Sequence, residues 1–423
     1  MTQPCDLGIH AIAELIHDGD LLPSQLLESC LDRIDAREPA VGAWEVLDVE
    51  GARVQAKELD DRPPTGPLHG VPVGVKDIID VAGLPTRCGS PVRGGAPAAQ
   101  DAWIVRRLRE AGAVIVGKTV TTEFAYFTPG KTRNPHDVER TPGGSSSGSA
   151  AAVADRMVPL ALGTQTAAST TRPAAYCGVA GLVLPPGHLD DSGITGLSPT
   201  LDSMGFLTRS VPDLQLVAAG LLGMDRAPGL DHAPALRICA AEQFGEVEPA
   251  MREGLASSVA ALHNSGAVVD RLAPEAAPGS LVQAHLDIMA VEAAQSLAAE
   301  TGQVSPSLQA LLDQGRATSE AAYRRAIDHA RRQRDAVTEQ LRGFDAILAP
   351  AAPGPAPVGM PTGSPVFSRP WQVMGLTSVA VPGLRDTDGM PLGLQVIGRP
   401  DDVPRLLAVA EWIERVLARA VTG

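Results

Sequence analysis

The chain has 423 residues, of which 44% are hydrophobic and 20% are charged, an ordinary globular composition that supports a sizeable buried core. Its formal net charge of −14 argues against non-specific binding to nucleic acid or to an anionic membrane. The aromatic content of 3% argues against a stacking platform for nucleic-acid bases.

Cysteine and histidine spacings point to neither disulfides nor a metal. Five scattered cysteines (Cys5, Cys30, Cys88, Cys177 and Cys239) contain no C-x-x-C pair, and no two histidines show a zinc-site spacing. We therefore expect no metal and no other cofactor. The N-terminal segment lacks a basic stretch followed by an apolar run, and no apolar run is long enough to span a bilayer. The expected location is the cytoplasm.

The N-terminal third begins with helices and then contains a clear strand. Residues 8–36 are predicted to form two short helices, because apolar residues recur there at helical spacing. Within residues 66–82, three valines alternate with Pro72, Gly74 and Lys76, which predicts a buried strand. Lys76 should therefore project from the face opposite the valines.

Helices and strands then alternate along the chain. Residues 101–111 predict a helix and residues 113–116 a short buried strand. Residues 128–149 are typical of a loop, residues 150–154 open a helix, and residues 160–162 predict another strand. This alternation favours an α/β fold.

The C-terminal half is expected to be mainly helical before a final strand. Residues 245–342 show helical periodicity, and residues 349–370 are rich in proline and glycine and predict a loop. Residues 393–397 predict a strand, and residues 402–418 a terminal helix. Without a long linker, residues 1–423 are expected to form a single domain, in which 245–342 is a mainly helical, cap-like insertion.

Two Ser/Gly-rich turns in residues 142–173 carry the strongest chemical signal. Glycine-rich turns allow backbone N–H groups to converge on an anion, so residues 163–169 suit an oxyanion hole beside the hydroxyl of Ser169. Neither turn contains a histidine to act as base. A lysine whose pKa is lowered by burial is the alternative, and Lys76 on its strand is the candidate.

At this point the sequence resembles the amidase signature family. The resemblance runs from about residue 8 to 418, and its most specific motifs are GVPVGVKD at 70–77, TPGGSSSGSAAAVA at 141–154 and LGTQTAAS at 162–169. RPAAYCGVAG after the third motif and MPLGLQVIGRP near the C-terminus also match. The resemblance implies a central, twisted, mixed β-sheet covered by helices on both faces.

The resemblance also implies a catalytic triad. Its lysine falls on Lys76, its serine in a cis peptide on Ser145, and its nucleophile on Ser169, with the family's spacing between the two serines. By resemblance, Ser145 relays a proton from Ser169 to Lys76 and later returns it to the leaving amine. The family's oxyanion hole implies N–H donors at Thr166, Ala167, Ala168 and Ser169.

Several positions depart from the common family pattern. Gln165 and Arg172 suit a subgroup with Gln-Thr-Ala-Gly-Ser before the nucleophile, but Ala168 replaces a glycine even there. A positive φ at this position would strain an alanine. Thr170 and Thr171 stand where aliphatic residues are more usual. These departures bear on rate and substrate choice.

Some motifs have competing interpretations. Residues 112–119 fit a phosphate-loop pattern literally, but their variable residues read as the strand itself, which argues against nucleotide binding. Gly144, Tyr126, Phe127 and Trp371 are candidates for the substrate pocket, with core packing as the alternative for the aromatics. Arg172 either orders the turn after Ser169 by bonds to backbone or lies at the surface.

The predicted function is hydrolysis of amide C–N bonds through a Ser169 acyl-enzyme, with carbamates or esters as further candidate substrates. The predicted partner is a small-molecule amide or carbamate, with no nucleic acid, no membrane and a homodimer as one option. One alternative is the amidase subunit of a multi-subunit tRNA-dependent amidotransferase. Another is a catalytically weak protein with the amidase fold, motivated by Ala168, Thr170 and Thr171.

Overall fold

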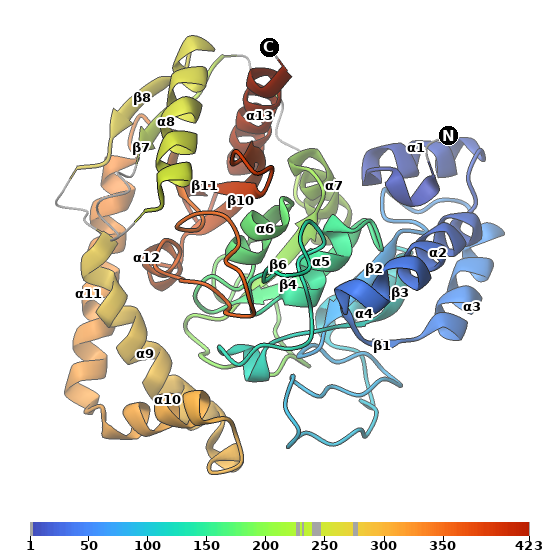
Figure 1. Ribbon diagram of the computed structural model, residues 1–423, viewed down its shortest axis with the longest axis horizontal. Coiled ribbons are helices and arrows are strands. Elements are labelled where there is room, and N and C mark those ends of the chain that lie inside the picture. The colour runs from blue at the N-terminus through green and yellow to red at the C-terminus, as the bar shows by residue number, and fades with distance from the viewer. Residues whose placement is uncertain (1–2, 226–228, 231, 239–246, 274–277, 423) are drawn as a thin grey trace.

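The computed structural model describes residues 3–225, 229–230, 232–238, 247–273 and 278–422. The described residues form one mixed sheet of 11 strands, in the order β1-β3-β2-β4-β6-β5-β10-β11-β9-β7-β8 (Figure 1). The strands are β1 (Trp44–Leu47), β2 (Pro72–Lys76), β3 (Val114–Thr119), β4 (Leu160–Gln165), β5 (Ala180–Val183), β6 (Ser203–Thr208), β7 (Ala235–Ile238), β8 (Val268–Arg271), β9 (Ala346–Pro350), β10 (Thr377–Arg385) and β11 (Pro391–Gly398).

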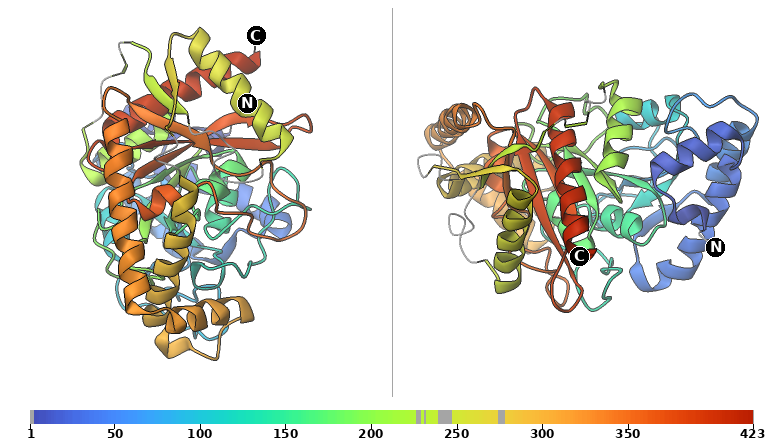
Figure 2. Two further views of the ribbon diagram at one scale, coloured as in Figure 1. Left: turned by 90° about the vertical axis from the view of Figure 1, so that its left-hand side faces the viewer. Right: turned by 90° about the horizontal axis from the view of Figure 1, so that it is seen from above.

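Helices cover both faces of this sheet and extend beyond one end of it. They are α1 (Ile9–Asp18), α2 (Pro23–Val41), α3 (Val49–Asp60), α4 (Trp103–Glu110), α5 (Ser147–Ala154), α6 (Thr171–Cys177), α7 (Val211–Leu222), α8 (Pro249–Asn264), α9 (Leu281–Ser296), α10 (Pro306–Ala317), α11 (Glu320–Gln340), α12 (Arg369–Val373) and α13 (Val403–Thr422). Helices α9–α11 lie on the opposite side of the molecule from α1–α3, and α9 runs beside α11 (Figures 1 and 2). None of the described helices is both long and apolar enough to cross a membrane.

Alternating side chains on the central strands pack into two hydrophobic cores, one on each face of the sheet. On β4, Leu160 and Leu162 join the larger core, whereas Ala161 packs into the smaller one with the alanines of α5. The valines of β2 join the larger core, as their alternation predicts. Both faces of the central sheet are therefore buried, which confirms the predicted α/β sheet with helices on each side.

Helix α5 lies unusually close to its neighbours because its residues are small. A Cβ atom on Gly148 would lie 2.2 Å from the carbonyl oxygen of Ala43 and 2.4 Å from the amide nitrogen of Val120. Only glycine fits such a contact with backbone atoms. The small residues after Ser145 thus allow this segment to pack closely against the backbone of neighbouring segments.

The sequence prediction missed strands in the middle of the sheet (β5, β6 and β10) as well as at its outer ends. The predicted helical stretch 245–342 contains a strand, β8, whose residues are mostly exposed and so lack an apolar pattern. Residues 245–246 and 274–277 of that stretch, and Cys239, lie outside the described residues. Strands β1, β7 and β9 and helices α3, α6 and α7 were also not predicted. The division of the chain into domains stays a prediction.

The phosphate-loop pattern at residues 112–119 belongs to the sheet. Three of its four variable residues lie in β3, as predicted, but the strand begins at Val114 and continues through Lys118 to Thr119, where a loop was expected. Lys118 is fully buried, and its Nζ lies 2.9 Å from Asp77 Oδ1 and donates to the carbonyl oxygen of Pro85 and the hydroxyl of Thr86. This ammonium group is engaged in an internal ion pair.

Candidate active site

Lys76 is the last residue of β2, and its side chain is fully buried. Its Nζ lies 2.7 Å from Ser145 Oγ and 2.7 Å from Thr164 Oγ1, a hydroxyl of the neighbouring strand β4. Burial lowers the pKa of Lys76 to about 7, against the opposite effect of the Asp202 carboxylate. Near neutral pH, a substantial fraction of this amine is therefore unprotonated and can accept the proton of Ser145.

Ser145 lies directly before α5 and is joined to Gly144 by a cis peptide bond. Its side chain is buried next to Lys76. Arg172 Nη2 donates to the carbonyl oxygen of Gly144, at 2.6 Å, and so contacts the same peptide unit. The sequence resemblance implied a cis peptide at this serine, and the structure has one there.

Ser169 lies in the turn between β4 and α6, next to the Ser145 segment. Its carbonyl oxygen accepts a hydrogen bond from the amide of Ser146, at 3.1 Å. Ser145 and Ser169 line one cavity together with Gly144, Thr166 and Ala167. About 330 Å³ of space, part of it open to solvent, lies between the residues that line it. The structure thus brings both serines and the lysine to one place from segments far apart in sequence.

The turn offers unused backbone donors beside the Ser169 hydroxyl. The amides of Ala167, Ala168 and Ser169 have no acceptor within the part of the chain that the structure describes. Ala167 and Ser169 line the cavity. Adjacent free N–H groups beside a nucleophilic hydroxyl are what stabilisation of an oxyanion requires.

Residues on distant elements hold this turn in place. His285 of α9 contacts the carbonyl oxygen of Thr166 through Nε2, at 2.8 Å, and so donates from that nitrogen. Burial lowers the pKa of His285 to about 3, so the ring is neutral. The hydroxyl of Thr166 donates to Asp202, whose other oxygen accepts the amides of Leu197 and Ser198.

The departures from the family pattern fit the turn without backbone strain. Ala168 is not among the described residues with positive φ, so its Cβ costs no left-handed conformation. Thr170 and Thr171 are buried, and their amides both donate to Gln165 Oε1, at 3.0 and 3.1 Å. The hydroxyl of Thr171 donates to the same oxygen. Both threonines are therefore part of a buried hydrogen-bond network.

Replacing Gln165 with alanine should weaken both the fold and the site. The change leaves two buried amides without an acceptor, at a cost of about 1–3 kcal/mol for each one that finds no other partner. We expect the free energy of unfolding to fall by about 2–4 kcal/mol and kcat to fall with it, since the turn before α6 carries Ser169. Urea denaturation and amide hydrolysis measure the two effects; an unchanged unfolding midpoint would contradict this role.

The predicted pocket residues separate into two groups. Tyr126, Phe127 and Gly144 line the cavity, and the two aromatic rings meet edge to face with centroids 4.9 Å apart. Trp371 is fully buried in the larger hydrophobic core and lines neither this cavity nor its neighbour. The prediction that it contributes to the pocket is corrected to core packing, which is what a bulky ring on α12 provides.

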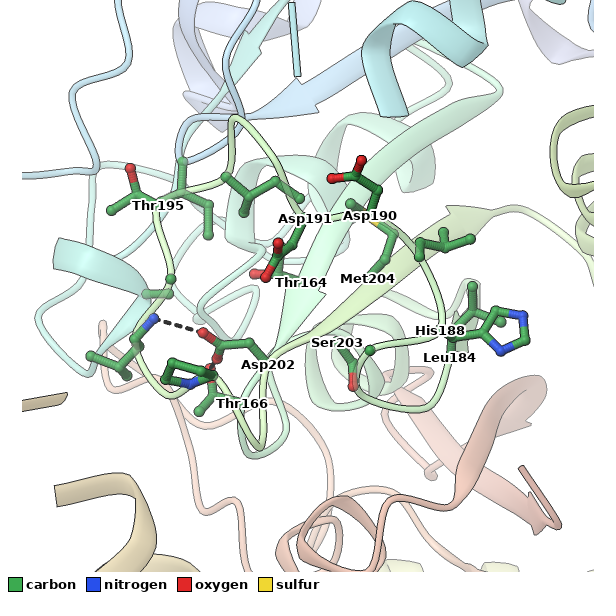
Figure 3. Close-up of a pocket in the computed structure, with 18 of the residues that line it drawn as sticks. Thr164, Thr166, Leu184, His188, Asp190, Asp191, Thr195, Asp202, Ser203 and Met204 are labelled. Carbon is green, nitrogen blue, oxygen red and sulfur yellow. Dashed lines mark hydrogen bonds between the residues drawn. The ribbon is translucent and has the colours of Figure 1, made fainter. Parts of the chain in front are cut away.

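A second cavity, of about 710 Å³, adjoins the first (Figure 3). The two share Ala125, Thr166 and Leu197. Thr164, the hydroxyl partner of Lys76, lies in the wall of the second cavity, as does Asp202. The first cavity thus borders Ser169, and the second borders Thr164, the hydrogen-bond partner of Lys76.

Arg172 is buried and is not a surface residue. Its guanidinium donates to the carbonyl oxygens of Gly144 and Gly363, at 2.6 and 2.7 Å, which agrees with the first of its two predicted roles, ordering the backbone near Ser169.

Within the described residues, no group of three His, Cys, Asp or Glu side chains gathers in a way that could hold a metal.

The sequence did not reveal the residues that support the three central side chains. They are Thr164, Asp202 and His285. Only Thr164 belongs to a motif that the sequence analysis singled out. The others come from loops and helices distant in sequence, where no local pattern marks their approach.

Comparison with known proteins places these features in a family. The family model described as Amidase matches residues 25–407. The chain is 32% identical to a Glutamyl-tRNA(Gln) amidotransferase subunit from Symbiobacterium thermophilum, over 94% of each chain. It is also 32% identical to the same-named protein from Roseiflexus castenholzii, over 98% of this chain and 97% of that protein.

Solved structures agree with the sequence relatives. A crystal structure of an amidase superposes with a TM-score of 0.88 at 31% identity, covering 97% of this chain and 99% of that one. A peptide amidase from Stenotrophomonas maltophilia superposes with a TM-score of 0.82 at 28% identity, covering 97% and 96%. The match over most of the chain in sequence and fold shows that the chain belongs to the amidase family, whose members act on carbon–nitrogen bonds.

Proposed function

We propose that the protein cleaves amide C–N bonds through an acyl-enzyme on Ser169. Ser169 Oγ attacks the carbonyl carbon while its proton passes to Ser145 and from there to Lys76. The proton returns along the same path to the amine as the C–N bond breaks, and water then hydrolyses the ester. The observation that carries this proposal is the 2.7 Å contact between Ser145 Oγ and the buried Lys76 Nζ, beside Ser169.

The electrostatics of the site support these roles. A lysine with a pKa of about 7 is a competent base near neutral pH, whereas an ordinary lysine is almost fully protonated there. The free amides at Ala167, Ala168 and Ser169 suit the negative oxygen of the tetrahedral intermediate, and Thr166 completes the predicted set of donors. Esters and carbamates remain within the proposal, because the same acyl transfer serves them.

Two settings for this chemistry are open, and the sequence relatives favour the second. In the first, the chain is a free-standing hydrolase of small amides, as a monomer or a homodimer, a setting supported by its likeness to solved amidases at 28–31% identity. In the second, it is the amidase component of a larger amidotransferase, supported by curated relatives with that name at 32% identity over nearly the full chain. A cytoplasmic location fits either setting.

The purified chain alone distinguishes these settings. We would measure ammonia release from a panel of primary amides, with intact mass and peptide mapping after exposure to a fluorophosphonate probe. Turnover with labelling of Ser169 favours a free-standing hydrolase. Labelling without turnover favours a component that needs partners, to be sought by co-purification from the source cells. Absence of both turnover and labelling contradicts the proposed chemistry.

A further inference from the structure

Helix α9 contacts the turn that carries Ser169 through a buried histidine. His285 is fully buried, and its Nε2 donates to the carbonyl oxygen of Thr166 at 2.8 Å. Its other ring nitrogen, Nδ1, is buried without a hydrogen-bond partner among the described residues. Because a buried polar atom without a partner destabilises a fold, an aliphatic side chain would suit this position better if packing alone decided it. The contact with Thr166 is therefore the feature that accounts for a histidine here.

The geometry of the peptide bond couples this contact to a neighbouring donor. In a planar trans peptide unit, the C=O of one residue and the N–H of the next point in opposite directions. The unit formed by Thr166 and Ala167 is trans. Since His285 holds the carbonyl oxygen of Thr166 on one side of this unit, the N–H of Ala167 points to the other side.

The Ser169 cavity lies on that other side. Thr166 and Ala167 line the cavity, whereas His285 lines neither this cavity nor the adjoining one. The N–H of Ala167 has no acceptor in the described part of the chain. His285 thus holds the peptide from the protein interior and leaves a free donor toward the space in which the tetrahedral intermediate forms.

A second set of contacts connects α9 to the side chain of Thr166. The Thr166 hydroxyl donates to Asp202, which lies next to it in the wall of the adjoining cavity (Figure 3). Asp202 also accepts the amide of Ser198, and the Ser198 hydroxyl donates to Glu292 of α9 at 2.6 Å. This set fixes the side chain of Thr166, whereas the contact with His285 sets the direction of its carbonyl group.

We propose that His285 is a positioning residue for the oxyanion hole, which directs the N–H of Ala167 at the developing negative oxygen by holding the carbonyl of Thr166. Without this donor, the peptide unit could turn and bring the carbonyl oxygen of Thr166 toward the cavity, where it would repel the oxyanion. The inference rests on the proposed acyl-enzyme chemistry and adds to it a residue that touches neither substrate nor nucleophile. Its effect should therefore fall on the transition state and spare the binding of substrate.

Kinetics of two variants test the proposal on an amide that the wild-type chain hydrolyses. His285→Leu should lower kcat by about 10–100-fold and leave KM nearly unchanged, since a donor of the oxyanion hole acts on the transition state. His285→Gln, whose amide nitrogen can take the place of Nε2, should recover most of that loss. Burial lowers the pKa of His285 to about 3, so the ring is neutral, and the limb of the pH–rate profile near pH 7 should stay in place in both variants.

Tyr323→Phe is the matched control for loosening of the helix. The Tyr323 hydroxyl donates to Glu292 of α9 at 2.7 Å, so its removal weakens the attachment of α9 without touching the carbonyl of Thr166. The kcat of this variant should stay at the wild-type value.

Binding of a charged tetrahedral adduct gives a readout that needs no turnover. Phenylboronic acid forms such an adduct with a serine hydroxyl and places a negative oxygen in the oxyanion hole, whereas benzamide binds without that charge. In His285→Leu, the concentration that protects Ser169 from the fluorophosphonate probe should rise about 10-fold or more for phenylboronic acid and stay nearly unchanged for benzamide.

An unchanged ratio of the two protecting concentrations in His285→Leu would overturn the inference, as would an equal loss of kcat in Tyr323→Phe. In both cases, labelling of wild-type Ser169 would leave the proposed chemistry intact. A wild-type chain that is neither labelled nor protected contradicts that chemistry itself, and the inference with it. If His285→Leu does not fold, His285→Asn, whose amide ends one bond short of Thr166, takes its place in the comparison with His285→Gln.

Discussion

Ser169→Ala is expected to lower kcat by about 10⁴–10⁶-fold, since removing the nucleophile of a serine hydrolase leaves only binding and oxyanion stabilisation. The hydroxyl is buried in the cavity wall beside Ser145. Ser169 contributes its carbonyl oxygen to the fold, and alanine keeps that group, so the unfolding midpoint should change little. Steady-state hydrolysis, fluorophosphonate labelling and urea denaturation measure these three outcomes.

Ser147→Ala is the matched control for this experiment. Ser147 lies two residues after Ser145 at the start of α5 and is also buried, but its hydroxyl donates to the carbonyl oxygen of Val120. Its removal should cost about 1 kcal/mol of stability and leave the labelling of Ser169 in place. Full activity of Ser169→Ala on every substrate found would end the proposed mechanism.

Lys76→Met should abolish activity while sparing, or even raising, the stability of the fold at low pH. The wild-type enzyme should show a rate that rises through about pH 7, as Lys76 loses its proton and becomes a base. Because the pKa is lowered in the folded state, the unfolded chain binds more protons between about pH 7 and 10.4, and wild-type stability should rise with pH across that window. This contribution to the slope should vanish in Lys76→Met.

Lys118→Met gives the opposite stability result and serves as the control. Lys118 is equally buried on the adjacent strand β3, but it is paired with Asp77. Its removal leaves a buried carboxylate without its partner, which typically costs about 3–5 kcal/mol. Urea denaturation of both variants at pH 6 and 9 makes the comparison. Equal destabilisation by the two methionines, or a pH–rate profile without a limb near pH 7, would contradict the role of Lys76.

The sequence predicted those parts of the fold and site that have local signatures. Alternating valines marked β2 and placed Lys76 on the opposite face, and the Ser/Gly-rich turns marked the segments of Ser145 and Ser169. The short outer strands β7 and β8 were missed, because half or more of their positions are not fully buried and their pattern is weak. The fully buried strands β5 and β6 were missed as well, because a short buried run does not by itself distinguish a strand from a helix.

The parts of the site that the sequence did not predict depend on contacts between residues that are far apart in the sequence. His285 approaches Thr166 across 119 positions of sequence, and Gln165 meets Gln372 across 207. No periodicity or motif encodes such a meeting. Trp371 was predicted to line the pocket but lies in the core. A large aromatic residue in a loop-rich region suits a pocket or a core equally until the packing is known.

The order of strands in the sheet has a consequence for synthesis of the chain on the ribosome. Strands β10 and β11 follow all the other described strands in the sequence, yet they join β5 on one side to β9 on the other. A nascent chain that has emerged only to residue 376 carries Lys76, Ser145 and Ser169 but holds two separate half-sheets with open edges. Such edges invite pairing with other chains. Protection from such pairing during translation thus depends on residues 377–398, and we expect a fragment bearing β10 and β11, supplied in trans, to restore a chain truncated before them.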